Sequence, residues 1–112
     1  MEFKLLVTKV DGKKLQERFG TDSVVTLLND GSGALVVGPM RADQLSNAAL
    51  VDKLGERRFD VELPASLKGG IGFSDTYYVK DELTIIYVYE GRDFACVVDE
   101  QTGAIKRCYE TR

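Results

Sequence analysis

The sequence predicts an α+β fold: a mainly antiparallel β-sheet of about six to eight short strands, with one helix near residues 41–54. Short apolar runs joined by tight turns fill the last third of the chain, from residue 76 to residue 109. One stretch rich in alanine and leucine has helical composition and helix end signals. The 112 residues are 44% hydrophobic, enough to build one core, so we expect a single domain over residues 1–112.

Two hairpins are predicted in the first third of the chain. Apolar and polar residues alternate over residues 3–7, which favours a strand, and Asp11-Gly12 favours a hairpin turn after it. Residues 15–19 then return as a second strand or a short irregular stretch. Two β-rich runs on either side of a turn-rich segment predict the second hairpin, from residues 24–28 and 34–37.

The segment Arg41–Leu54 is the predicted helix. Gly38-Pro39 ends the strand before it, Asp43 or Ser46 supplies an N-cap, and Gly55 supplies the stop. Its apolar residues do not form one clean stripe. The prediction therefore depends on propensity and end signals more than on periodicity.

The rest of the chain reads as strands. Residues 58–63 alternate without interruption, so Phe59, Val61 and Leu63 should face the core, and Pro64 should end the strand. The segment 83–89 is apolar on both faces, which predicts a central strand covered on one side by the helix. A glycine-rich loop over residues 68–75 precedes four predicted strands, at residues 76–79, 83–89, 94–98 and 104–109.

Composition argues against an enzyme, a cofactor or a metal site. The chain has no histidine, the commonest general base and metal ligand. Its two cysteines form no C-x-x-C pair, which removes a structural zinc site. The loop at Gly69–Gly72 lacks a phosphate-binding motif and leads into a strand rather than a helix. The acidic residues of the last third fall mostly in predicted turns, where they would be solvated.

The expected compartment is the cytosol. No apolar stretch approaches the length of a membrane span, and the first residues lack the apolar core of a signal peptide. Cys96 and Cys108 flank the last predicted turn, where a hairpin register that set them opposite each other would allow a bridge. In a reducing compartment we expect free thiols.

Tyrosine and negative charge gather in the same third of the chain. The net charge is −3, and residues 75–112 carry all of this excess, with eight acids against five bases. This balance opposes binding to nucleic acid and suits a basic protein partner. Tyrosine is enriched at binding surfaces, and all of the tyrosines lie in the last 36 residues: Tyr77, Tyr78, Tyr87, Tyr89 and Tyr109.

We therefore expect a non-enzymatic cytosolic protein-binding module, such as a small inhibitor or immunity-type protein that blocks a basic partner, for example a nuclease toxin. The alternative is a small-ligand-binding domain with a pocket between helix and sheet and the loop at Gly69–Gly72 at its mouth. An enzyme that uses only carboxylates, tyrosine or cysteine ranks last. A homodimer through an exposed edge strand is compatible with either function. The predicted partner-binding residues are Tyr77, Tyr78, Asp81, Glu82, Glu90 and Asp93.

Overall fold

A computed structural model describes residues 12–20, 22–39, 46–64, 67 and 69–111. These residues form two antiparallel four-stranded sheets and one helix, so the predicted fold class is confirmed. Sheet A has the strand order β1-β2-β3-β4, and sheet B has the order β5-β6-β7-β8. The elements are α2 (Gly12–Phe19), β1 (Val24–Leu27), β2 (Gly33–Val37), β3 (Ala48–Asp52), β4 (Arg57–Asp60), β5 (Gly72–Val79), β6 (Glu82–Tyr89), β7 (Arg92–Val98) and β8 (Ile105–Glu110).

The position of the predicted helix is wrong. The second half of the segment 41–54 forms β3, and residues 41–45 lie outside the described part of the chain. Side chains of β3 are covered on both faces of sheet A. Leu50 packs in the core between the sheets, and Val51 packs against α2 on the other face. Such a strand is apolar on both sides, and composition alone does not separate it from a helix.

The helix lies instead at Gly12–Phe19, where the sequence predicted a hairpin turn followed by a strand or a short irregular stretch. Leu15 and Phe19 are four residues apart, so they share one face of the helix and pack against sheet A. Gly20, with a φ of 98°, follows the helix and donates its N–H to the carbonyl of Gln16. The strand predicted at residues 3–7 lies outside the described residues.

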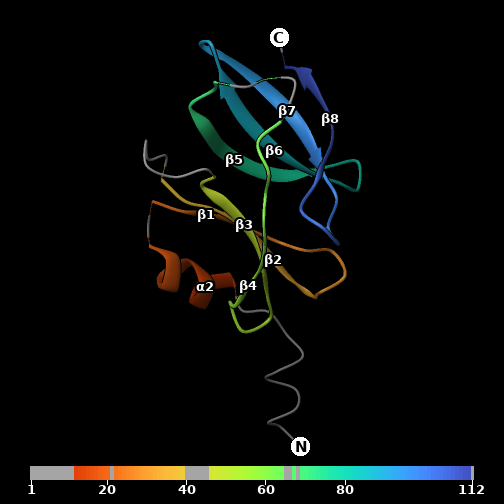
Figure 1. The fold of residues 1–112 in the computed structure, drawn as a ribbon. Coiled ribbons are helices and arrows are strands. Elements are labelled where there is room, and N and C mark those ends of the chain that lie inside the picture. Colours follow the sequence, from red (N-terminus) through yellow and green to blue (C-terminus); the bar gives the residue numbers. More distant parts are fainter. Residues whose placement is uncertain (1–11, 21, 40–45, 65–66, 68, 112) are drawn as a thin grey trace, which may run out of the picture.

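The main core lies between the two sheets (Figure 1). It joins Leu35 and Leu50 of sheet A to Ile85 and Tyr87 of sheet B, all four fully buried. β6 is an inner strand, as predicted, but α2 covers the opposite face of sheet A rather than sheet B. Val61 is buried as expected.

Phe59 and Leu63 were expected in the core, but they are 40% and 38% exposed. Phe59 lies on β4, which is an edge strand of sheet A. Leu63 lies beyond the end of that strand. An alternating pattern shows which side chains share a face, but it does not show whether a neighbouring strand covers that face.

Side-chain hydrogen bonds connect the two sheets. The amide of Asn47 donates from Nδ2 to the carbonyl of Phe73 (2.6 Å), and its Oδ1 accepts the N–H of Phe73 (2.8 Å). The hydroxyl of Thr26 on β1 donates to the carbonyl of Thr76 on β5 (3.0 Å). These bonds satisfy backbone groups at the edge of β5, where a β-bulge interrupts the pairing with β6.

The glycine-rich loop closes over a buried phenol. The hydroxyl of Tyr87 donates to the carbonyl of Leu67 (2.8 Å) and accepts the N–H of Gly70 (2.9 Å). A Cβ at Gly70 would overlap this hydroxyl, so the loop needs a residue without a side chain here. Gly70 therefore has a structural role.

Cys96 and Cys108 form a disulfide, so the expectation of free thiols is wrong. The two residues are direct partners in the pairing of β7 with β8. Thr111 donates its N–H to the carbonyl of Asp93, so Asp93 and Thr111 form a hydrogen-bonded pair of the ladder. Hydrogen-bonded and non-hydrogen-bonded pairs alternate along an antiparallel ladder, and the cysteines lie three positions further along, so they form a non-hydrogen-bonded pair. Such pairs bring the two Cα atoms close together, and here they are 4.1 Å apart. The register therefore decides the pairing.

Candidate interaction surface on sheet B

The predicted tyrosines point to opposite faces of sheet B. Tyr77 is paired with Thr84 on the face that turns away from sheet A, and it is 41% exposed. Tyr78 is paired with the buried Leu83 and packs against the core between the sheets. Successive residues of a strand alternate between faces, so the two rings cannot bind one partner side by side.

Tyr78 is held by the turn between β1 and β2. Its hydroxyl accepts the N–H of Asn29 (3.0 Å). Burial raises the pKa of Tyr78 to about 12, and the nearby carboxylates of Glu100 and Asp30 act in the same direction, against the opposing effect of the Asn29 bond. This ring is a half-buried structural contact that stays neutral, rather than a freely exposed anchor.

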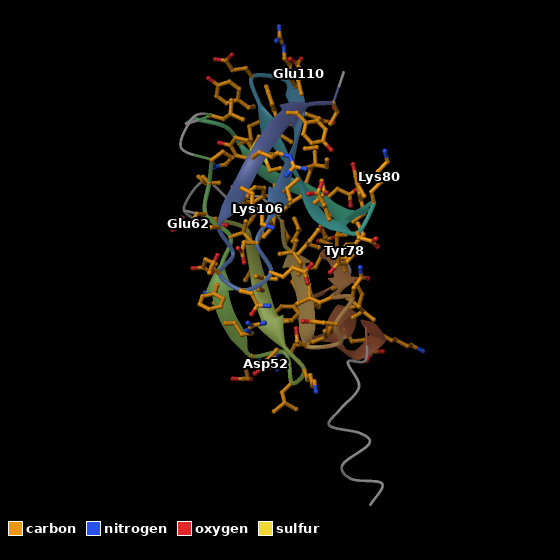
Figure 2. The ribbon with its side chains drawn as sticks, turned by 90° about the vertical axis from the view of Figure 1, so that its right-hand side faces the viewer. Asp52, Glu62, Tyr78, Lys80, Lys106 and Glu110 are labelled. Carbon is orange, nitrogen blue, oxygen red and sulfur yellow. A yellow bond between two sulfur atoms is a disulfide. The ribbon has the colours of Figure 1, made fainter. Side chains whose placement is uncertain are left out.

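The four predicted carboxylates do not form one rim. Lys80 and Asp81, with φ of 48° and 69°, make the tight turn between β5 and β6, and Glu82 begins β6. Glu90, with φ of 51°, makes the next turn at the other end of β6, and Asp93 follows on β7. The length of β6 separates the two groups by about 23 Å, at roughly 3.3 Å per residue. In Figure 2, Lys80 marks the turn that contains Asp81, and Glu110, which pairs with Phe94 next to Asp93, lies at the top of the molecule.

The first of these groups adjoins another acidic turn. Asp81 and Glu82 line a shallow pocket of about 290 Å³ together with Asp99 and Glu100 from the turn between β7 and β8. Glu82 forms an ion pair with Arg107 (2.5 Å). The Oδ1 of Asp99 accepts two backbone N–H groups of its own turn, so this carboxylate has a structural role. Lys106 also lines this pocket, and its positive charge makes the pocket only moderately acidic.

The side chains of sheet B that turn away from sheet A form a distinct surface, which we call the tyrosine face. Its exposed aromatic residues are Tyr77 on β5 and Tyr109 on β8, and the side chain of Tyr109 is 46% exposed. β5 and β8 are the two edges of the sheet, and Tyr109 lies two residues along β8 from Arg107, which shares the row of Tyr77. The Cα atoms of the two tyrosines therefore lie roughly 16 Å apart at the usual strand spacing. The register assigns the remaining members: Asp75, Val79, Glu82, Thr84, Ile86, Val88, Asp93, Ala95, Val97 and Arg107.

The centre of the tyrosine face is buried, and its exposed side chains lie around this centre. Thr84 and Val97, in its centre, are 0% and 2% exposed. Three of the six predicted residues lie on this face: Tyr77, Glu82 and Asp93. Tyr109 was not among the predicted partner-binding residues. The alternation of β8 and its pairing with β7 could have placed it beside them.

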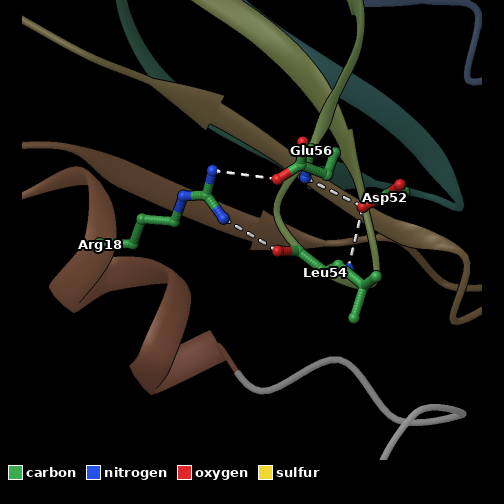
Figure 3. A network of polar contacts seen from close by, with 4 residues as sticks. All are labelled: Arg18, Asp52, Leu54 and Glu56. Atoms are coloured by element: carbon green, nitrogen blue, oxygen red, sulfur yellow. Dashed lines mark hydrogen bonds and ion pairs between the residues drawn. The ribbon is translucent and has the colours of Figure 1, made fainter.

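A second hollow lies between α2 and sheet A. It has a volume of about 600 Å³, with a floor that includes Val36 and Ala49 and a rim that includes Arg18 and Arg57. Arg18 reaches from α2 to the turn between β3 and β4, where it donates to the carbonyl of Leu54 (3.0 Å) and pairs with Glu56 (3.2 Å; Figure 3).

Asp52 shapes the turn that Arg18 contacts. Its Oδ1 accepts the N–H groups of Leu54 and Glu56, each at 2.9 Å (Figure 3). The residues Gly69–Gly72 of the glycine-rich loop do not line the pocket of about 600 Å³.

Within the described ranges, no group of three or more cysteine and acidic side chains is arranged to hold a metal ion. None of the helices described there is long and apolar enough to cross a membrane. No protein family model, curated protein or solved structure matches this chain. The function is therefore inferred from the chain's own geometry.

Proposed function

We propose that this protein is a non-enzymatic binding module that recognises a basic protein through the tyrosine face. The observation that carries the proposal is the placement of Tyr77 and Tyr109 on one sheet face, with acidic side chains at its margin. Exposed tyrosine rings supply large contact areas at low entropic cost. A partner that covers both rings would also approach Asp75, Glu82 and Asp93.

Charge complementarity favours a basic partner. Asp75 and Asp93 are exposed on the tyrosine face, and Arg107 is paired with Glu82. Asp81, Asp99 and Glu100 add carboxylates beside the face, where Lys106 offsets part of their charge. Such an arrangement raises the association rate with a cationic surface and makes binding sensitive to salt. An inhibitor or immunity protein that covers a nuclease toxin is one form of this function.

The test compares partner capture by matched variants. Tyr77→Ala and Tyr109→Ala each remove one ring from the face, and Leu54→Ala removes a 65% exposed side chain from the turn between β3 and β4. Immobilised proteins are incubated with extract of the source cell, and a captured protein is then purified and its affinity measured. We expect a partner of positive net charge that binds the parent and Leu54→Ala equally. Each tyrosine variant should bind it at least about 10-fold more weakly, as for an interface hot spot.

Salt provides the second readout of this test, because screening weakens contacts between exposed charges. Binding should weaken as the salt concentration rises. A partner that binds both tyrosine variants as tightly as the parent would contradict the proposal.

A small-ligand-binding function is the second candidate, favoured by the pocket of about 600 Å³ between α2 and sheet A. Ligand pockets typically measure roughly 300–1,000 Å³ and combine apolar walls with a few polar groups. A thermal-shift screen with metabolites, nucleotides and sugars tests it, because a ligand that binds the native state raises the melting temperature. The shift should disappear in Arg57→Ala, and the absence of any shift across the panel would contradict this function.

A further inference from the structure

We propose that the disulfide between Cys96 and Cys108 is a redox switch that holds β8 in place and thereby completes the tyrosine face. The switch concerns the structure of β8 itself. Its effect on partner binding rests on the function proposed above. Two side chains of the tyrosine face, Arg107 and Tyr109, belong to β8 and move with it.

β8 buries little surface of its own. Four of its six residues are exposed, and only Ile105 and Cys108 are half-buried. The strand is an edge of sheet B and pairs only with β7 among the described strands. Figure 2 looks towards this strand, with Lys106 and Glu110 labelled along it. Apolar burial therefore contributes little to keeping β8 attached.

The other contacts of β8 are mostly exposed. Arg107 pairs with Glu82, and Glu110 pairs with Arg92 at 3.5 Å, with all four side chains between 38% and 67% exposed. Exposed ion pairs add little stability. Just beyond β8, Thr111 donates its N–H and its hydroxyl to the carbonyl of Asp93 (3.1 and 3.0 Å). The backbone ladder and the disulfide thus do most to hold the strand.

The disulfide links the weakly held strand to a well-held one. Cys96 on β7 is fully buried in the core between the sheets, and Cys108 lies on the edge strand. The bond closes a loop with a sequence separation of 12. By the chain-entropy relation for an unfolded chain, a loop of this length would make a detached β8 up to about 100-fold rarer than it is in the reduced protein.

Reduction would proceed by exchange with a dithiol. One thiolate of the dithiol attacks the Sγ of Cys108, the more exposed of the two cysteines, and Cys96 leaves as a thiolate and takes a proton. The second thiolate of the dithiol then attacks the mixed disulfide and releases Cys108, which is also protonated. The protein gains two electrons and two protons, and the dithiol is oxidised to its own disulfide.

The two redox states then present different surfaces. In the oxidised protein Tyr77 and Tyr109 both stand on the tyrosine face. In the reduced protein β8 opens more often, and each opening removes Tyr109 and Arg107 from the face. Cytosolic thiol pools reduce accessible disulfides, whereas oxidising compartments preserve them. The binding surface would therefore report the redox state of its surroundings.

Hydrogen exchange of the whole protein tests the switch without a partner. Amide exchange is measured in the oxidised protein, in the protein reduced with dithiothreitol, and in the double variant Cys96→Ala/Cys108→Ala. The amides of Tyr109 and Thr111 should exchange up to about 100-fold faster after reduction. Those of β2 and β3 should change little. The double variant should exchange its β8 amides at the rate of the reduced protein, and dithiothreitol should not change that rate.

Selective exchange in β8 supports the switch, whereas no change in β8, or equal acceleration throughout both sheets, overturns it. Affinity for a captured partner in both redox states then tests the regulatory effect. If Tyr77→Ala lowers the affinity for the partner but reduction of the disulfide does not, the regulatory effect is overturned and the proposed function stands. If neither Tyr77→Ala nor Tyr109→Ala changes the affinity for the partner, the proposed function is overturned. The hydrogen-exchange result then still decides whether the disulfide acts as a switch.

Discussion

Replacing Asn47 by alanine should destabilise the protein more than any exposed substitution. The Asn47 amide makes three hydrogen bonds, to the N–H and C=O of Phe73 and to the carbonyl of Gly38 (2.8 Å). Phe73 is fully buried, so its backbone groups cannot take water as a substitute partner. Each net hydrogen bond is worth about 1 kcal/mol, and leaving buried partners unsatisfied raises the cost. We expect Asn47→Ala to lower the free energy of unfolding by about 3 kcal/mol.

Urea denaturation followed by circular dichroism measures this loss. At a slope of about 1–2 kcal/mol per molar for a domain of this size, the midpoint should fall by roughly 1.5–3 M. Asn29→Ala is the matched control. Asn29 is exposed, and only its backbone N–H makes a described bond, to Tyr78. This control should stay within about 0.5 kcal/mol of the parent.

A third variant separates the individual bonds. Asn47→Asp keeps the oxygen that accepts the N–H of Phe73 but loses the donor to two carbonyls, so it should be no more stable than Asn47→Ala. If Asn47→Ala unfolds at the same urea concentration as Asn29→Ala, the inferred role of Asn47 in joining the two sheets is incorrect.

Three further predictions concern stability. Tyr87→Phe removes the hydroxyl that bonds two backbone groups of the glycine-rich loop and should cost about 1–3 kcal/mol by urea denaturation; an unchanged midpoint would contradict this role. Gly103→Ala should lower the melting temperature measurably, because Gly103 has a φ of 78° and a Cβ there would lie 2.9 Å from the carbonyl of Asp60. Gly31→Ala is its control, since Gly31 also has a positive φ but has open space around it. Burial raises the pKa of Tyr78 from 10.0 to about 12, so the stability from its neutral phenol is complete below pH 10 and is lost as the pH rises towards 12. Urea denaturation between pH 8 and pH 11 should show a smaller decline in Tyr78→Phe than in the parent, and equal declines would refute the assignment.

Local patterns predicted the second half of the fold well. A short apolar run between turn residues located β6, and the turn residues Lys80-Asp81 and Glu90-Gly91 adopt the left-handed conformation of tight hairpins. They failed for β3, because its apolar run is rich in alanine and leucine, a composition that favours a helix, and a strand covered on both faces has no alternation to oppose that interpretation. They also failed for α2, because Asp11-Gly12 favours a hairpin turn, whereas Leu15 and Phe19 form the apolar face of a helix.

The candidate surface was predicted only in part, because it depends on which strands become edges. The opposite directions of Tyr77 and Tyr78 follow from alternation alone. The burial of Tyr78 against the turn between β1 and β2 depends on how the two sheets meet, which no local pattern contains. The exposure of Tyr109 likewise required knowing that β8 is an edge strand. The disulfide depended on the register of β7 with β8, and the expectation of free thiols came from the assumed compartment.

The strand order has a consequence for the route by which the chain folds. Every pair of neighbouring strands in either sheet is also consecutive along the chain. Proteins whose contacts join residues close in sequence have low contact order and tend to fold quickly. Each sheet can therefore grow by successive hairpins, and the step with the largest entropic barrier should be the docking of one completed meander onto the other.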